Sequence, residues 1–508
     1  MTVDTSADTG APAIRARRMG LLSQHEAIIL MRSDCHVCRA EGLYARAQVV
    51  ISGPDGRQAY ATLYQVEDDW LAPGEAGLSE ALWNRLGVAA GTPLHIRHAP
   101  PLESLSSVRR RVHGQRLSAE AYRGIVDDAA AGRYTDIHLA AFLTASSALP
   151  LDQDEVIALT EAMVDAGDRL AWPAGIVVDK HCVGGLPGNR TTPIVVAIAA
   201  ACGLTMPKTS SRAITSPAGT ADTMETMALV DLDLKGMRRV VEQEGGCIVW
   251  GKAVNLSPAD DVFIRVERVL DIDTEGQLIA SVLSKKIAAG SSHVVLDIPV
   301  GATAKVRTDE AGEALARALE GVAAHFGLTT RCILSDGAQP VGRGIGPALE
   351  AHDVLAVLQN DPNAPQDLRR RACLLAGAAL EIGGVAPAGE GARKAEQVLA
   401  GGQAWAKFQA ICRAQGGLRT PGVASQRRPL LATHGGRVTH INNRKIARLA
   451  KLAGAPDVKV AGVRMFVRLG DEVQAGAPVL DVHADSPGEM AYAMDYAHHN
   501  PDLLEIEA

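Results

Sequence analysis

The sequence predicts a multidomain α/β protein. At 508 residues the chain is too long for one compact core, so two to four domains are expected. Between Gly175 and Gly417, short apolar segments alternate with helical patterns, which predicts a sheet with helices on its faces. The composition is that of an ordinary globular protein, with 47% hydrophobic and 21% charged residues.

Changes of pattern along the chain divide it into four predicted domains. These are an N-terminal β-rich, barrel-like domain (1–100), a helical domain (101–172), a mixed α/β domain (173–420) and a C-terminal α+β domain (425–508). Pro100 and Pro101 mark the end of the first domain. For the barrel-like domain we expect a role in packing or oligomerisation, because it contains no cluster of catalytic residue types.

Each predicted domain has its own candidate elements. The N-terminal strands are predicted at Ala27–Met31, Ala45–Ser52, Ala59–Val66 and Pro93–His98, with a helix at Leu78–Leu86. The helical domain is predicted to contain helices at Ala119–Ala131, Asp136–Ser147 and Asp152–Leu170, the last with a capping box formed by Asp152 and Glu155. The α/β strands are predicted at Ile176–Val178, Cys247–Trp250, His293–Ile298 and Arg331–Leu334. A helix within Val438–Leu452 and a hairpin-rich end are predicted for the last domain.

Charge and composition exclude several classes of partner. A net charge of -7 and only 3% aromatic residues argue against nucleic-acid binding. No uncharged apolar stretch approaches the roughly 18 residues of a membrane span. The N-terminus has no apolar signal region, and the eight cysteines are scattered, so a cytoplasmic location is expected. Cys35 and Cys38 form one close pair, for which a metal or redox role stays open.

The stretch from Val177 to Glu225 holds two glycine- and hydroxyl-rich loops on either side of an apolar helix candidate. A helix that starts after such a loop leaves backbone N–H groups unpaired, and these suit an anion. Lys180, at the end of the preceding strand, can add a point charge for a phosphate. The first loop lacks the lysine of a P-loop at the required spacing, so that motif is excluded.

The second loop begins at Ser210 and contains more hydroxyl groups than helix capping requires, together with Arg212 as a fixed charge. We predict that the two loops face each other and hold a phosphate next to a sugar. His181 is either a packed, hydrogen-bonded residue or a catalytic one, and its position beside Lys180 favours catalysis as much as packing.

These motifs resemble those of the thymidine/pyrimidine-nucleoside phosphorylase family, and most closely its long (type 2) branch, which includes AMP phosphorylases and bacterial proteins labelled thymidine phosphorylases. The matching motifs are Asp179-Lys-His-x-x-Gly-Gly, Ser210-Ser-Arg-Ala-Ile-Thr-Ser-x-x-Gly-Thr-x-Asp-x-x-Glu225, Ser257-Pro-Ala-Asp-Asp261 and Ala280-Ser-Val-Leu-Ser-Lys-Lys286. The resemblance extends over nearly the whole chain.

The resemblance implies phosphorolysis of an N-glycosidic bond. Inorganic phosphate would attack C1′ of a nucleoside or nucleoside monophosphate and release the free base and a (deoxy)ribose 1-phosphate. It also implies a fold of the nucleoside phosphorylase/phosphoribosyltransferase type and a homodimer or larger assembly. No metal and no cofactor are expected, since phosphate is itself the co-substrate.

The family's site residues can be carried over position by position. Phosphate is expected to bind at Lys180, Thr192, Ser210 and Thr220. The nucleoside or nucleotide is expected to bind at Gly185, Ser211, Arg212, Ala213, Ile214, Thr215, Ser216, Thr220, Ser281 and Lys305, and Lys285, one helical turn after Ser281, could also reach the base. The expected catalytic residues are His181 and Asp273. Asp273 matches the proton donor of the AMP-type branch, although on its own it also fits a solvated turn carboxylate.

Two positions depart from the family pattern. Cys182 replaces a serine that binds phosphate, and a thiol is a poorer hydrogen-bond donor. Val266 replaces an arginine with which pyrimidine-specific members hold the base, and a displaced arginine does not easily replace such a clamp. Val266 therefore favours a nucleotide or a non-pyrimidine substrate, and thymidine is kept as an alternative substrate. Two alternatives are also kept: a phosphoribosyltransferase of the anthranilate type, which would need Mg²⁺, and a non-catalytic nucleotide-binding protein.

Overall fold

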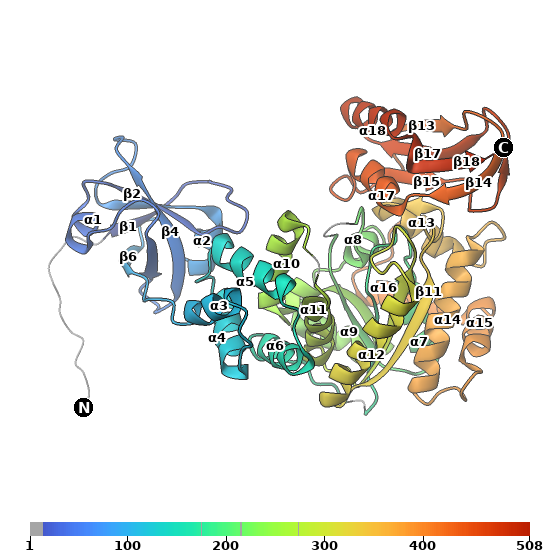
Figure 1. The fold of residues 1–508 in the computed structure, drawn as a ribbon, viewed down its shortest axis with the longest axis horizontal. Coiled ribbons are helices and arrows are strands. Elements are labelled where there is room, and N and C mark those ends of the chain that lie inside the picture. The colour runs from blue at the N-terminus through green and yellow to red at the C-terminus, as the bar shows by residue number, and fades with distance from the viewer. Residues whose placement is uncertain (1–13, 174, 214–215, 273, 508) are drawn as a thin grey trace. The chain divides into compact units, whose positions relative to one another are not determined.

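Figure 1 shows the computed structural model, which describes residues 14–173, 175–213, 216–272 and 274–507. The chain divides into two compact units, residues 1–145 and 146–508, and the division falls inside helix α5 (Asp136–Ala148). The four-domain division drawn from the sequence stays a prediction. Among the described residues, no helix is both long and apolar enough to cross a membrane.

Six strands of the N-terminal unit close into a barrel, which confirms the barrel-like fold predicted for this region. In the order β1-β5-β2-β4-β3-β6, the strands are β1 (Ile14–Arg18), β5 (Glu75–Leu78), β2 (Ile28–Arg32), β4 (Gln58–Val66), β3 (Gln48–Ser52) and β6 (Pro93–His98). Apolar side chains such as those of Ile29, Ile51 and Leu63 fill its interior. Strands β1 and β5 lie outside the predicted strands, because β1 contains three arginines and β5 has only four residues.

Short helices accompany the barrel. They are α1 (His36–Glu41), α2 (Glu80–Leu86), α3 (Leu105–Val112) and α4 (Ala119–Ala130), followed by α5. Helix α2 begins after Ser79, whose side chain accepts a hydrogen bond from the Leu82 N–H as an N-cap. Helix α6 (Gln153–Asp165) belongs to the second unit, and Asp152 and Glu155 form its predicted capping box.

Five parallel strands form the centre of the second unit. They are β7 (Val178–Cys182), β8 (Met206–Ser210), β9 (Gly246–Trp250), β10 (His293–Val300) and β11 (Thr329–Asp336). They pair in the orders β11-β10-β7 and β8-β9, and a parallel bridge between Val177 and Thr205 brings β7 next to β8. Strand β8 lies outside the predicted strands, because it carries a lysine, Lys208, that is buried.

Helices surround these strands. They are α7 (Thr192–Ala201), α8 (Thr220–Glu225), α9 (Leu234–Glu244), α10 (Pro258–Leu270), α11 (Glu275–Ala288), α12 (Asp309–His325), α13 (Pro347–Leu358), α14 (Gln366–Ile382), α15 (Gly391–Ala400) and α16 (Gln403–Ala414). Helix α7 packs against α14 and α16, and each of its residues from Thr192 to Ala200 is buried. This burial explains why the helix predicted between the two loops is apolar on every face.

The chain ends in a smaller α+β part, as predicted, drawn in orange and red in Figure 1. Its elements are β12 (Gly344–Ile345), β13 (Gln426–Leu431), β14 (Gly436–Ile441), α17 (Asn443–Leu452), β15 (Gly462–Met465), β16 (Glu472–Val473), β17 (Pro478–Ala484), α18 (Pro487–His499) and β18 (Leu504–Glu507). One sheet has the order β12-β15-β17-β13 and the other the order β16-β14-β18. Because β12 directly precedes α13, the first sheet is joined to the α/β part.

Candidate active site

The two predicted phosphate loops leave the carboxyl ends of neighbouring parallel strands. Loop 1 (residues 183–191) connects β7 to α7, and loop 2 (residues 211–219) connects β8 to α8. In open α/β sheets, ligands bind beyond the carboxyl ends of the strands, where loops and helix N-termini meet. The topology therefore brings both loops to the same edge of the sheet.

A buried carboxylate with two buried lysines lies beneath these loops. Lys286 Nζ of α11 lies 2.6 Å from Asp179 Oδ2, and Lys208 Nζ of β8 lies 3.1 Å from Asp179 Oδ1. Burial alone would raise the pKa of Asp179, but the two ammonium groups hold it below its usual value. Burial lowers the pKa of Lys286, and Asp179 opposes that shift. The cluster fixes β7 against β8 and α11.

Loop 1 begins next to this cluster. Lys180 is almost fully buried, and its Nζ donates a hydrogen bond of 2.9 Å to Thr191 Oγ1 at the end of the loop. Thr192, the first residue of α7, is also buried. An ammonium group has three donors, so one such bond leaves Lys180 able to bind an anion as well. Its charge is thereby held at the N-terminus of a buried helix.

Arg190 joins loop 1 to loop 2. Its Nη1 donates a hydrogen bond of 2.7 Å to Thr220 Oγ1, and its Nη2 donates one of 2.9 Å to the Ala218 carbonyl. Its Nε forms a 2.7 Å ion pair with Glu350 of α13, which also accepts a hydrogen bond from Thr223. Because Thr220 Oγ1 is an acceptor here, its own hydrogen is available to donate to a ligand.

Loop 2 is held by a second, more exposed group of charges. Arg212 forms a bidentate pair of 2.7 Å with both oxygens of Glu225, and its guanidinium lies 4.6 Å from the Trp250 ring centroid. Asp222 accepts hydrogen bonds from the backbone N–H of Ala213 and Gly219, and the ammonium of Lys459 lies 3.2 Å from it. These contacts shape the backbone of the loop.

Four predicted residues of loop 2 therefore have distinct surroundings. Arg212 and Ala213 take part in the ion network, whereas Ser211 is exposed and Ser216 donates to the carbonyl of Ala218. Ser210 ends β8, is buried, and its Oγ has no hydrogen-bond partner among the described residues. A buried hydroxyl without a partner is available to a ligand.

His181 lies at the end of β7 and is partly buried. Burial holds the pKa of its imidazole well below the usual value, and the nearby Lys286, Lys208 and Lys285 lower it further. The imidazole is consequently neutral at neutral pH in the ligand-free protein, and it can donate or accept one hydrogen bond at each nitrogen. Such a group can orient a substrate, but it carries no excess proton.

The predicted base-binding residues Ser281 and Lys285 lie on α11. Ser281 is partly buried, and Lys285 Nζ forms a 2.7 Å ion pair with Asp260 of α10. Asp260 belongs to the Ser257–Asp261 motif, so this ion pair joins two of the motifs found in the sequence. Val266 is buried in α10.

Two glycines of loop 1 allow close approaches between backbones. At Gly185 (φ 82°), a Cβ would lie 2.5 Å from the backbone nitrogen of Lys305, and at Gly188 (φ 68°) it would lie 2.1 Å from the carbonyl oxygen of Val341. No other residue fits these positions without a shift of the backbone. Gly185 and Lys305, predicted together from the family motif, are in direct contact, and the Lys305 side chain is exposed.

Cys182 lies where the family has a serine. Asn189 Nδ2 lies 3.4 Å from its Sγ and donates to Asp297 Oδ2 at 3.2 Å, and Ser335 donates to the other oxygen of Asp297. Burial and Asp297 raise the pKa of the Cys182 thiol to about 12, so it is protonated at neutral pH. Ile214, Thr215 and Asp273 lie outside the described residues.

Several residues of the site were not singled out by the sequence patterns. Lys208 and Arg190 fall inside the Val177–Glu225 stretch, and Lys286 ends the Ala280–Lys286 motif, but none of the three carries a predicted role. Glu350 lies 160 residues after Arg190. A lysine within an otherwise apolar strand is a usable signal for Lys208, because lysine is rarely buried without a partner. Nothing local to Glu350 predicts its pairing with Arg190.

Cys35 and Cys38, for which the sequence left a metal or redox role open, lie at the start of α1. Cys35 is the N-cap of α1, and its Sγ accepts a hydrogen bond from the Cys38 N–H at 3.2 Å. Within the described ranges of the chain, no group of three or more His, Cys, Asp or Glu side chains is arranged to hold a metal ion.

Two protein families match the chain. Residues 174–405 match the glycosyl transferase family, a/b domain, and residues 106–167 match the glycosyl transferase family, helical bundle domain. Proteins named "Putative thymidine phosphorylase" match over almost their whole length. The protein of Chelativorans sp. (strain BNC1) is 65% identical over 498 residues, and that of Tolumonas auensis is 62% identical over 496 residues; in both cases 98% of each chain is covered.

Among solved structures, the chain resembles the anthranilate phosphoribosyltransferase (TrpD) of Thermus thermophilus. The TM-score is 0.50 at 21% identity, covering 61% of this chain and 99% of that one. At this identity the similarity concerns the fold alone, and it agrees with the predicted combination of a helical domain and an α/β domain.

Proposed function

Because the chain belongs to the thymidine/pyrimidine-nucleoside phosphorylase family, we propose that it catalyses phosphorolysis of a nucleoside or nucleoside monophosphate. A phosphate oxygen forms a new bond to C1′ while the bond from C1′ to the base nitrogen breaks. The products are the free base, which takes up a proton, and a (deoxy)ribose 1-phosphate. The transition state has oxocarbenium character, as in glycoside cleavage in general.

The observation that carries this proposal is the junction of the two loops at Arg190. Its hydrogen bond to Thr220 brings the N-terminus of α8 to the loop that precedes α7. An anion in this junction can receive hydrogen bonds from Lys180, from Thr220 and from Ser210, whose Oγ has no partner among the described residues. Thr192 lies at the N-terminus of α7. Such a site would hold phosphate in position for attack and offset its charge.

The remaining predicted residues are proposed either to bind the nucleoside or to donate a proton to the leaving base. Ser281, Lys285, Gly185 and Lys305 are proposed to contact the nucleoside. Since His181 is neutral, it suits the orientation of substrate better than protonation of the leaving base. We therefore assign proton donation to Asp273, by its match to the family motif.

The test is to incubate purified protein with inorganic phosphate and a panel of thymidine, uridine, AMP and CMP, and to follow release of the base. We expect release to depend strictly on phosphate and to yield one equivalent of sugar 1-phosphate. Val266, in place of a base-clamping arginine, favours AMP over thymidine and uridine. Binding of these ligands without any turnover would contradict the proposal and favour a non-catalytic nucleotide-binding protein.

We further propose that the enzyme needs no cofactor, acts in the cytoplasm in nucleotide salvage, and assembles as a homodimer or larger. Activity in excess EDTA should equal that of untreated enzyme, because phosphate itself is the attacking group. Strict dependence on Mg²⁺ with a phosphoribosyl pyrophosphate substrate would instead favour the anthranilate-type phosphoribosyltransferase. Light scattering measures the size of the assembly.

A further inference from the structure

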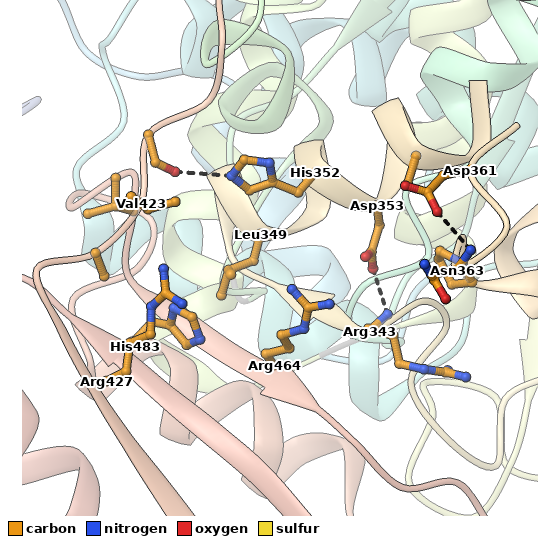
Figure 2. A pocket seen from close by; sticks show the side chains of 15 residues that line it. Arg343, Leu349, His352, Asp353, Asp361, Asn363, Val423, Arg427, Arg464 and His483 are labelled. Atoms are coloured by element: carbon orange, nitrogen blue, oxygen red, sulfur yellow. Dashed lines mark hydrogen bonds between the residues drawn. The ribbon is translucent and has the colours of Figure 1, made fainter. Parts of the chain in front are cut away.

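A cavity of about 300 Å³ lies at the start of the C-terminal part, apart from the two loops. One wall is helix α13, through Leu349, His352 and Ala356, and the opposite wall is the sheet β12-β15-β17-β13. Figure 2 shows side chains from both walls, including Arg464, His483 and Arg427. A volume of this size is at the lower end of the range of small-molecule sites.

The sheet wall is strongly basic. Arg427 of β13 is the cross-strand partner of His483 of β17. On its other side, His483 pairs with a residue of β15, and Arg464 lies two residues further along that strand. Because side chains alternate along strands, these three residues share one face of the sheet. Within the described parts of the chain, the guanidinium groups of Arg427 and Arg464 have neither an ion-pair nor a hydrogen-bond partner.

His483 lies between these two arginines and is 4% exposed. Its Nε2 is buried and has no hydrogen-bond partner among the described residues. Buried polar groups are nearly always paired, so an unpaired one in the wall of a cavity is available to a ligand. On the helix side, His352 is held by a hydrogen bond between its Nε2 and the Gly422 carbonyl.

No carboxylate among the described residues of the cavity forms an ion pair with these arginines, although Arg464 lies near enough to Asp353 to oppose the rise that burial causes in the pKa of that carboxyl. Asp353 Oδ2 accepts hydrogen bonds from the backbone N–H groups of Arg343 and Gly344, at 2.6 Å and 2.7 Å. Asp361 accepts a hydrogen bond from the Asn363 N–H. Asp481 is the cross-strand partner of Arg464, but the described residues include no ion pair between them. The basic wall therefore keeps unused donors.

We propose that this cavity is a second binding site that takes a phosphate group, free or as the ester of a small sugar. Two guanidinium forks and one imidazole N–H approach from three strands, which offers more donors than the two oxygens of a carboxylate accept. A phosphate ion leaves much of the cavity empty, whereas a pentose phosphate also covers the apolar side chains of Leu349 and Ala356. The site is distinct from the loops around Lys180 and Thr220.

Calorimetric titration with ribose 5-phosphate tests this site. The full-length Lys180→Ala protein serves as the parent, because that change weakens phosphate binding at the loops. We expect saturable binding to this parent, and a loss of affinity of about tenfold or more when Arg427→Ala or Arg464→Ala is added. Both arginines are exposed, so these variants should fold normally, and their thermal unfolding is the check.

Arg428→Ala provides the matched control, because Arg428 is exposed and adjacent on β13 but points to the other face. It should bind ribose 5-phosphate like the parent. A parallel titration with inorganic phosphate distinguishes the two possible ligands. If phosphate binds more weakly than ribose 5-phosphate, the ligand is the sugar ester. If both bind equally, the ligand is free phosphate. Absence of binding to the parent, or equal binding by the Arg427→Ala and Arg464→Ala variants, overturns the proposal.

Discussion

Loop 1 and loop 2 meet at Arg190, but they are held in place by different kinds of ion pairs. Beneath loop 1, Asp179 pairs with Lys208 and Lys286, and the side chains of all three are at most 6% exposed. At loop 2, Asp222 and Glu225 of α8 pair with Arg212 of the loop and with Lys459 of the C-terminal part. The side chains of these two cations are 29% and 37% exposed.

This difference in exposure means that the ion pairs beneath loop 1 hold it more rigidly than the ion pairs at loop 2 hold that loop. A charge left unpaired in a dry interior is costly, whereas one that reaches water can be hydrated. Loop 1 thus depends on its cluster for folding, and loop 2 can lose one of its ion pairs and remain in place. We expect substitutions beneath loop 1 to act mainly on stability and those in loop 2 mainly on substrate binding.

Asp179→Asn should have the largest effect. It leaves the buried Lys208 and Lys286 without their counter-ion, and removal of one partner of a buried pair costs about 3–5 kcal/mol. Urea unfolding measures the loss of stability. A variant as stable as the parent would show that the cluster does not anchor loop 1.

Asp273→Asn tests whether the proton that the leaving base takes up comes from a residue outside both loops. If Asp273 protonates the leaving base, kcat should fall by about 100-fold to 10,000-fold with no change in unfolding. Asp271→Asn, two residues earlier at the exposed C-cap of α10, is the matched control and should keep full activity. An active Asp273→Asn enzyme would refute the assignment.

Lys180→Ala tests loop 1 as a phosphate site. Loss of the buried ammonium should lower kcat/KM for phosphate by about 100-fold while nucleoside binding changes little. Lys235→Ala, an exposed lysine on α9, controls for the loss of a positive charge. An unchanged dependence on phosphate would count against Lys180.

Asp222→Asn, in the first turn of α8, is the counterpart of Asp179→Asn for loop 2. Its cations remain hydrated and Glu225 still pairs with Arg212, so we expect a loss of only about 1–2 kcal/mol in unfolding free energy. A loss equal to that of Asp179→Asn would remove the distinction between the two anchors.

Cys182→Ser should have the smallest effect. The thiol is protonated and accepts only a weak bond from Asn189, and a hydroxyl restores the stronger donor of the family pattern. Steady-state kinetics with varied phosphate should give an equal or lower KM. Complete loss of activity would mean that the thiol has a role of its own.

The fold was largely predictable because the spacing of apolar residues and the composition of loops are local properties of the sequence. Four of the six barrel strands, the capping box at Asp152 and the apolar helix α7 follow from such patterns. The anchors of the loops were not predictable in this way. Glu350 pairs with Arg190 although the two are 160 residues apart in the sequence, and Asp179 pairs with lysines of two other elements. Both pairings therefore depend on the tertiary arrangement.

The cavity beside α13 shows the same limit. Arg427, Arg464 and His483 come from three strands and form no motif in the sequence. Only the register of the sheet brings them together on one face. Clusters assembled by register are therefore found from the structure, whereas loops such as Ser210–Glu225 are found from the sequence.

The most direct measurement is a crystal structure of the protein with bound phosphate. If loops 1 and 2 form one phosphate site, a single anion should lie within hydrogen-bond distance of both Lys180 Nζ and Thr220 Oγ1. An anion that contacts only one of these groups, with the other turned away from it, would contradict the shared site.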